Sequence, residues 1–290
     1  MKEIAIIGST ASGKTGLSLE IAHKTNSIIL SLDSLSVYKE IDVASAKPSK
    51  KERGDIIHFG IDEVHPNEEF DVIQFISCYK KAKGFAQANN KNLIIVGGTG
   101  FYLKSLIEGI STGVDFKVKL DSNVGEIYDL LYSLDKDYMS KIKRNDKYRI
   151  EKAYSIYKKT NLTPSTYFKE NPKVPIAKNL QLFEIIWEKE ELKKRIYKRT
   201  SMMMNEGIID EVVYLEKKYT RKPNSMSSIG ILETLEFLDG KIDKRQLEEK
   251  IALNTIKLAK RQNTFNKGQF KSNKISNIIT NLNSDIIKYF

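Results

Sequence analysis

The sequence predicts an α/β protein: a parallel sheet flanked by helices, with a small helical domain inserted. Short runs rich in β-branched residues alternate with amphipathic segments of helical period. A glycine-rich loop joins the first of these strands to the first helix, and charged helix-forming residues replace the strand pattern over residues 113–178. At 290 residues the chain can hold one large core, expected over 1–112 and 179–290, with the insertion between them.

The composition narrows the classes of function. A net charge of +11, from 48 basic and 37 acidic residues, suits a polyanionic partner such as nucleic acid. The charge gathers in residues 257–274, which hold six basic residues and no acidic one. Cys78 is the single cysteine, which excludes an internal disulfide and a thiolate zinc site, and His23, His58 and His65 lack metal-ligand spacing.

The chain has no apolar run near twenty residues, and its first strand begins almost at once. These features predict neither a membrane span nor a signal peptide. We expect a cytoplasmic protein that has no membrane association and is a monomer.

The first strand, over residues 4–7, leads into a loop with the spacing G-x-x-x-x-G-K-T. Glycines allow the backbone amides to approach an anion, the lysine adds a positive charge, and the following helix adds its dipole. The threonine hydroxyl can bind Mg²⁺. The pattern predicts a P-loop-type fold and a cradle for a phosphate or diphosphate, formed by Gly8, Ser9, Thr10, Ala11, Ser12, Gly13, Lys14 and Thr15.

Two further strand ends should face the same crevice, because ligands of open parallel sheets bind at the carboxyl ends of strands. The strand at 27–32 ends on Asp33, whose alternative role is to cap a helix. The strand at 93–96 ends in Gly97-Gly98-Thr99-Gly100, where a P-loop triphosphatase would place a carboxylate. Asp33 is therefore the candidate for the carboxylate that such a site would need, and Lys47 is expected in the same crevice.

The remaining elements follow from hydrophobic period and from glycine and proline positions. We expect a weak strand at 56–59, an amphipathic helix at 71–88 and another strand at 180–187. Inside the insertion we expect helices at 121–134, 140–142 and 148–159, then an exit loop through Pro164, Pro172 and Pro175. Later helices are expected at 192–204 and 208–219, after Ser228-Ile229-Gly230 through Leu238, and at 245–265. The last twenty residues are expected to form a loosely held tail with a final apolar segment.

Taken without any family, these residues leave several functions open. A kinase or other phosphotransferase would use Asp33 for magnesium or for the acceptor hydroxyl. A group transferase would use the cradle to hold diphosphate as a leaving group. A nucleotide-gated RNA-binding protein without chemistry would leave Asp33 and the glycine turn without a role.

Five segments, in the same order and spacing, resemble the bacterial tRNA dimethylallyltransferases, also called tRNA isopentenyltransferases. They are GSTASGKT at 8–15, DSLSVYKEIDVASAKP at 33–48, GGTGFYLKSL at 97–106, RIYKRTSMMMNEGIIDEV at 195–212 and AKRQNTF at 259–265. The resemblance implies transfer of a dimethylallyl group from dimethylallyl diphosphate to N6 of the adenosine 3′-adjacent to the anticodon, at position 37 of tRNAs, with Mg²⁺ as cofactor. A relative that prenylates free adenine nucleotides is the alternative, but it would need neither the insertion nor the basic helix.

The same resemblance implies roles for individual residues. Asp33 would be the general base, Thr99 would lie near the reacting groups, and Lys14 and Arg199, rather than Arg195, would contact the diphosphate. A solvated helix face is the alternative for both arginines and for the segment 257–274. The insertion would clamp the anticodon stem-loop, and the implied tRNA contacts are Asp33, Ser34, Leu35, Ser36, Thr99, Lys119, Tyr148, Arg149, Lys152, Lys260, Arg261, Gln262 and Lys267.

The sequence also departs from the family pattern. Most departures fall on expected RNA contacts and leave the cradle intact, and the change from Arg to Lys loses bidentate geometry while it keeps the charge. They are Ser36 for a usual Gln, Ala44-Ser45-Ala46 for Gly-Thr-Ala, Lys152 for Arg, Ser227 for a common Arg, and Phe265-Asn266-Lys267 for an ending that contains Trp.

Overall fold

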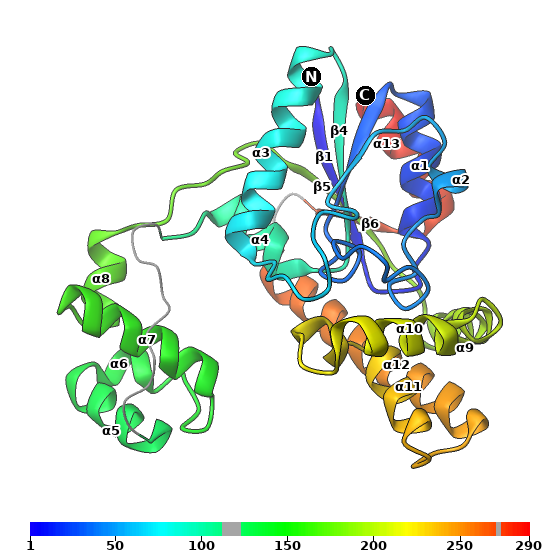
Figure 1. Cartoon of the computed structure of the whole chain (residues 1–290). Coiled ribbons are helices and arrows are strands. Elements are labelled where there is room, and N and C mark those ends of the chain that lie inside the picture. The colour runs from blue at the N-terminus through cyan, green and yellow to red at the C-terminus, as the bar shows by residue number, and fades with distance from the viewer. Residues whose placement is uncertain (112–122, 271–273) are drawn as a thin grey trace. The chain divides into compact units, whose positions relative to one another are not determined.

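The computed structural model describes residues 1–111, 123–270 and 274–290, and its centre is a parallel β-sheet (Figure 1). Among these residues the sheet has six strands in the order β3-β2-β4-β1-β5-β6. β1 lies between β4 and β5, with Ile6 opposite Val96 on one side and Phe183 on the other. The strands are β1 Glu3–Gly8, β2 Ser27–Ser31, β3 His58–Phe59, β4 Asn92–Gly97, β5 Gln181–Ile185 and β6 Lys274–Asn277.

Helices cover both faces of this sheet, which fits the runs of apolar residues in β1, β2 and β4. The helix α3 (Val72–Ala88) lies on one face, and α1 (Lys14–Lys24) with α13 (Ile279–Tyr289) lies on the other (Figure 1). Ile6 of β1 and Ile21 of α1 are fully buried in the apolar cluster between the sheet and these two helices. This arrangement confirms the predicted α/β class and brings the ends of β1, β2 and β4 to one edge of the sheet.

A second apolar cluster forms beside that edge, where the later helices pack together. Its fully buried members include Ile208, Leu215, Ile231 and Leu247. None of the helices in the described ranges is long and apolar enough to cross a membrane. The other helices of this part are α2 Lys50–Arg53, α4 Gly100–Glu108, α9 Lys189–Asn205, α10 Ile208–Tyr219, the 3₁₀ helix η1 Asn224–Ser227, α11 Ile231–Leu238 and α12 Lys244–Gln269.

The chain divides into two compact units, one of Met1–Lys104 with Lys178–Phe290 and the other of Ser105–Ala177. The second unit thus begins earlier than the expected boundary at 113. Its core is its own, with Leu131, Met139 and Ile150 fully buried. Its described helices are α5 Val124–Leu134, α6 Lys136–Met139, α7 Lys147–Thr160 and α8 Pro164–Glu170.

Two local expectations inside this unit are wrong. The short helix expected at 140–142 lies at Lys136–Met139, because the Asp135 carboxylate accepts a hydrogen bond from the Tyr138 amide and starts the helix there. Pro164 begins α8 instead of an exit loop. Thr163 caps that helix, and a proline fits its first position because no amide hydrogen is needed there.

The tail is not loosely held as expected, although the final apolar segment expected within it is present as α13. β6 extends the sheet beside β5, and α13 packs against α1. Leu282 and Ile286 are fully buried. The many Asn, Ser and Lys residues of this segment conceal an apolar face at helical spacing, which is sufficient to bring the C-terminus into the core.

Candidate active site

The loop between β1 and α1 has the backbone of an anion cradle. Ala11 and Gly13 have positive φ angles of 61° and 92°, and such turns can direct successive amides toward one point. A Cβ at Gly8 would lie 2.9 Å from the Ile185 carbonyl oxygen, so close packing requires glycine there. Within the described residues no side chain caps the N-terminus of α1. Its first amides are therefore open to an anion.

Two side chains outside the loop hold its carbonyl groups. Arg195 Nε donates to the Ala11 carbonyl at 2.9 Å, and Trp187 Nε1 donates to the Ser12 carbonyl at 2.9 Å. The Arg195 guanidinium also lies over the Trp187 ring, 4.4 Å from its centre. These contacts fix the orientation of the Ala11 and Ser12 carbonyls, and thus of two peptide planes of the cradle.

Lys14 carries the positive charge of the cradle. Its Nζ donates to the Ser9 carbonyl and, at 3.3 Å, to Ser12 Oγ. Burial, with a smaller contribution from Arg199, lowers the pKa of Lys14 to about 7, while Asp33 acts in the opposite direction. An anionic ligand would favour the protonated form of this amine.

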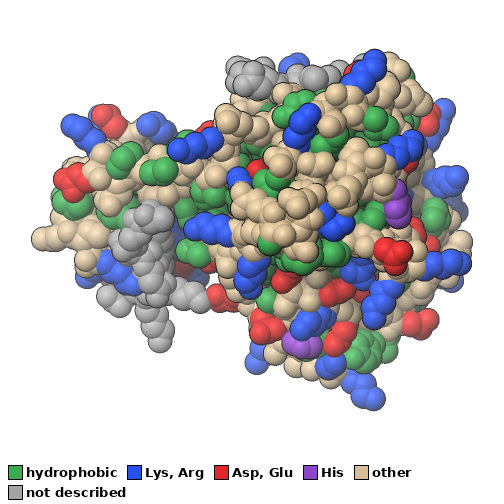
Figure 2. All heavy atoms as spheres, turned by 90° about the horizontal axis from the view of Figure 1, so that it is seen from above, with side chains coloured by type: hydrophobic (Ala, Val, Ile, Leu, Met, Phe, Trp, Pro, Cys, Tyr) green, Lys and Arg blue, Asp and Glu red, His purple; other side chains and the backbone are tan. Residues whose placement is uncertain are grey.

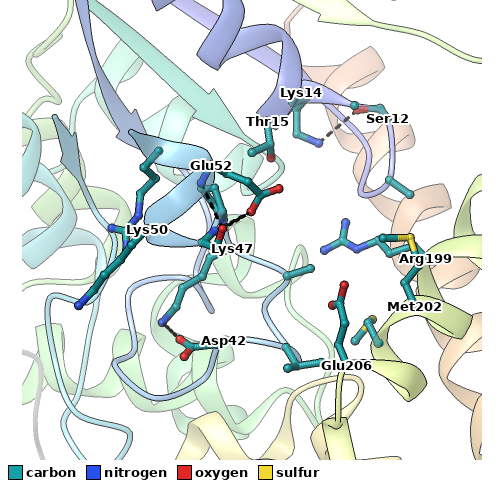
Figure 3. A pocket seen from close by; sticks show the side chains of 18 of the residues that line it. Ser12, Lys14, Thr15, Asp42, Lys47, Lys50, Glu52, Arg199, Met202 and Glu206 are labelled. Atoms are coloured by element: carbon teal, nitrogen blue, oxygen red, sulfur yellow. Dashed lines mark hydrogen bonds and ion pairs between the residues drawn. The ribbon is translucent and has the colours of Figure 1, made fainter. Parts of the chain in front are cut away.

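A pocket of about 1240 Å³ opens from the cradle and is drawn in Figure 3. Lys14, Thr15 and Arg199 line it together with Met202. It therefore offers both cationic groups and apolar surface. Lys47 lines it as expected, but its side chain is only 5% exposed.

The charge of Lys47 is balanced inside the protein. Its Nζ lies 2.7 Å from Asp42 Oδ1 and 2.5 Å from Asp62 Oδ1, and it also donates to the Tyr38 carbonyl. Two carboxylates within contact distance neutralise a single lysine. We therefore expect Lys47 to contribute less than Lys14 or Arg199 to binding an anionic ligand.

Asp33 lies just beyond β2, in a second pocket that Lys14 and Thr15 also line. Its Oδ1 accepts hydrogen bonds from the amides of Leu35, at 2.8 Å, and Ser36, at 3.2 Å. The capping alternative is thus realised in a turn rather than in a helix. Oδ2 accepts no hydrogen bond from the residues that the structure describes, so it can take a proton.

The glycine turn after β4 lies against the Asp33 turn. Thr99 Oγ1 accepts a hydrogen bond from the Ser34 amide at 3.2 Å, and the Thr99 amide donates to the Leu32 carbonyl at 3.1 Å. A Cβ at Gly97 would lie 2.6 Å from Leu32, which explains glycine at this position. A third pocket, of about 520 Å³, is lined by Asp33, Thr99 and other residues of the same edge.

Arg199 extends from α9 into all three pockets. Its Nη1 donates to Thr10 Oγ1 at 3.1 Å and its Nη2 to the Ser45 carbonyl at 3.4 Å. Burial lowers the pKa of Arg199, and the carboxylates of Asp33 and Glu206 partly offset this. Since Arg195 also contacts the cradle, a solvated helix face describes neither arginine.

Comparison with known proteins identifies the family of this chain. The model of the IPP transferase family matches residues 36–269 of this chain. The chain belongs to the IPP transferase family. It is 72% identical over 290 residues to a tRNA dimethylallyltransferase of Aliarcobacter butzleri, covering 100% of this chain and 99% of that one. A tRNA dimethylallyltransferase of Sulfurimonas denitrificans is 52% identical over 280 residues, covering 93% of both.

Solved structures of IPP transferases have the same fold. A tRNA isopentenylpyrophosphate transferase of Bacillus halodurans is 27% identical, with a TM-score of 0.74, and the match covers 99% of this chain and 95% of that one. A eukaryotic dimethylallyltransferase described as acting on tRNA is 26% identical, with a TM-score of 0.86, over 97% of this chain and 75% of that one.

The residues that the family resemblance assigns to tRNA fall into distinct groups. Lys260, Arg261 and Lys267 are exposed on α12, and their side chains form no hydrogen bond or ion pair with described residues. Tyr148, Arg149 and Lys152 lie on α7 in the second unit. Lys119 lies outside the described residues. Ser34 is exposed, Leu35 is half-buried and Ser36 is buried.

Two residues of the Phe265-Asn266-Lys267 departure from the IPP transferase pattern lie in packing contacts. Phe265 packs against Gly100, where a Cβ would lie 2.5 Å from the phenyl ring. Asn266 is buried and donates to Glu184 Oε1 at 3.1 Å. Ser227 is exposed, and its hydroxyl donates to the Asn224 carbonyl.

Sequence reasoning missed the residues that act only by supporting the loops. Glu211 accepts hydrogen bonds from three consecutive amides, of Asp42, Val43 and Ala44, at 2.7–2.9 Å. Burial raises the pKa of this carboxyl. Glu211 and Arg195 both lie in the segment 195–212 of the resemblance, whereas Trp187, the single tryptophan, had no local signal beyond its place after a strand.

Proposed function

We propose that this chain transfers a dimethylallyl group from dimethylallyl diphosphate to N6 of adenosine 37 in tRNAs, which releases pyrophosphate and gives N6-dimethylallyladenosine. The names of its relatives support this reaction. The observation that carries it is the shared pocket, in which the cradle residues Lys14 and Thr15 meet the Asp33 carboxylate, with its open Oδ2. An anion site beside a proton acceptor suits a reaction that expels diphosphate and deprotonates its acceptor.

Each half of this site has a chemical task. The lone pair of the adenine amino group is delocalised into the ring, so N6 attacks the allylic carbon well only if a base takes its proton; Asp33 Oδ2 is that base. As the N6–carbon bond forms, the carbon–oxygen bond to diphosphate breaks. The negative charge that grows on the leaving group is stabilised by the loop amides, Lys14 and Arg199.

Thr15 fits a role in binding Mg²⁺. The described residues contain no group of three or more His, Cys, Asp or Glu side chains that could hold a metal ion alone. Magnesium commonly uses few protein ligands together with substrate phosphates and water. Thr15, the last residue of the cradle, is exposed at the start of α1, where its hydroxyl could join diphosphate oxygens in binding the ion. The bound ion would neutralise diphosphate charge.

The acceptor base must leave the anticodon-loop stack to reach Asp33. Asp33, Ser34, Leu35, Ser36 and Thr99 would surround the splayed nucleotide. Phe101, which is 56% exposed and lines the third pocket, offers a ring on which a base can stack. The tRNA backbone would follow Lys260, Arg261 and Lys267 on α12, and the second unit, with Lys119, Tyr148, Arg149 and Lys152, would bind the anticodon stem-loop. The chain would act in the cytoplasm as a monomer.

The test is a reaction of the purified protein with Mg²⁺, dimethylallyl diphosphate and unmodified tRNA that carries adenosine at position 37. Digestion to nucleosides and mass measurement should show N6-dimethylallyladenosine. A parallel reaction with AMP as acceptor should give no prenylated product. ATP hydrolysis or phosphate transfer without modified adenosine would instead identify a phosphotransferase and contradict the proposal.

A further inference from the structure

The side chain of Gln262 connects two loops that lie far apart in the sequence. Its Oε1 accepts a hydrogen bond from the Thr10 amide at 2.8 Å, and its Nε2 donates to the Gly98 carbonyl at 3.1 Å. Thr10 belongs to the cradle, and Gly98 belongs to the glycine turn. One amide on α12 thus joins the loop expected to hold diphosphate to the turn that carries Thr99.

The glycine turn is shaped to admit this amide. A Cβ at Gly98 would lie 2.4 Å from Gln262 Nε2, a distance that real Cβ atoms do not reach. The Gly98 backbone does not have a positive φ, so contact with Gln262 rather than conformation explains the glycine. Gly100 is likewise in close contact with Phe265, farther along α12. The helix therefore packs directly onto the turn.

Gln262 differs in this respect from its neighbours on α12. Lys260 and Arg261 are exposed, whereas Gln262 is half-buried and uses both ends of its amide within the protein. A glutamine that reads a base edge would need those same atoms. The contacts therefore do not favour the tRNA-binding role that the family resemblance implies for Gln262.

We propose that Gln262 is a positioning residue that holds the cradle and the glycine turn at a fixed separation. This inference rests on the proposed transfer reaction. Thr10 Oγ1 accepts a hydrogen bond from Arg199, and Thr99 Oγ1 accepts one from the Ser34 amide, next to Asp33. Through these two contacts the bridge sets the leaving diphosphate against the base that serves the acceptor.

The first test separates this role from RNA contact by comparing Gln262→Ala with Arg261→Ala. Binding of dimethylallyl diphosphate with Mg²⁺ is measured by calorimetry without tRNA, and tRNA binding is measured separately. Loss of the bridge should weaken diphosphate binding roughly 3- to 10-fold and lower kcat, with tRNA affinity unchanged. Arg261→Ala should weaken tRNA binding alone. Normal diphosphate binding by Gln262→Ala, with weakened tRNA binding, would overturn the inference.

The second test uses the glycine that faces the amide. Gly98→Ala should displace the Gln262 side chain and give the same loss of diphosphate affinity, but it should add little in a Gln262→Ala background. Additive losses would contradict the bridge. Gln262→Met, which keeps the length of the side chain, should match Gln262→Ala, and thermal melting checks that each variant folds. A wild-type protein that binds dimethylallyl diphosphate but modifies no tRNA would contradict the proposed reaction. The binding measurements would still test the Gln262 bridge in that case.

Discussion

The cradle and the outer face of α12, which carries Lys260, Arg261 and Lys267, differ in how their polar groups are partnered. The Ala11 and Ser12 carbonyls of the cradle are held by Arg195 and Trp187, and its Thr10 amide is held by Gln262. The side chains of Lys260, Arg261 and Lys267, exposed on α12, have no partners among the described residues. Figure 2 shows, on another face of the molecule, Lys and Arg scattered among Asp and Glu, so the net charge alone does not locate a binding surface. If the proposed roles hold, this difference predicts that the cradle contributes mainly to rate through its fixed geometry, whereas the α12 surface contributes affinity through unpaired charge.

The largest effect should come from the carboxylate at the edge of the cradle. Asp33→Asn keeps an oxygen that can accept from the Leu35 and Ser36 amides but removes the base. We expect single-turnover transfer to slow by about 10²- to 10⁴-fold while diphosphate and tRNA dissociation constants stay near wild type. A rate within about threefold of wild type would remove Asp33 from the mechanism.

A smaller effect should follow from Arg199→Lys, which tests whether geometry matters in the cradle beyond charge. Lysine cannot keep both the Thr10 Oγ1 and the Ser45 carbonyl contacts, because it lacks the planar fork of arginine. The KM for dimethylallyl diphosphate should rise roughly 10- to 100-fold. Lys194→Ala, an exposed position on the same helix that lines none of the three pockets, is the control and should have little effect.

The outer face of α12 should respond more weakly and depend on salt. Lys260→Ala, Arg261→Ala and Lys267→Ala should each weaken tRNA binding roughly 3- to 10-fold at moderate salt. Each should also reduce the slope of log affinity against log salt concentration by about one. Fluorescence titration across a salt series measures both quantities. A wild-type affinity that does not change with salt would argue against phosphate contacts on this helix.

The smallest effect concerns the charge state of Lys14. Its pKa of about 7 lies below the ordinary value, so the free protein loses this charge as pH rises through 7. Binding a diphosphate favours the ammonium, and so binding should take up a proton and weaken about 2- to 5-fold between pH 7 and 8. Calorimetry in two buffers of different protonation enthalpy detects the uptake. In Lys14→Arg the uptake assigned to this residue should disappear.

Local patterns explain which parts of this site could be predicted from the sequence. The cradle residues are contiguous, and Asp33 and the glycine turn directly follow strands whose β-branched runs mark them as buried. Arg195 and Arg199 share a helix face by their spacing. Each of these inferences needed only neighbours in the chain and the rule that parallel strands end at one edge of the sheet.

The missed features depend on partners distant in the sequence. Gln262 meets Thr10 across 252 residues, and Trp187 meets Ser12 across 175. The sequence placed Lys47 in the crevice but gave no sign of its pairing with Asp62, which reaches it only in the folded chain. The C-terminal segment looked loose because its polar composition outweighed the few apolar residues that bury against α1.

The division between the two regions is tested most directly by measuring KM for both substrates in two variants side by side. Arg199→Lys belongs to the cradle and Arg261→Ala to the outer face of α12. We expect Arg199→Lys to raise the KM for dimethylallyl diphosphate alone and Arg261→Ala to raise the KM for tRNA alone. Two variants that both raise the KM for the same substrate would contradict it.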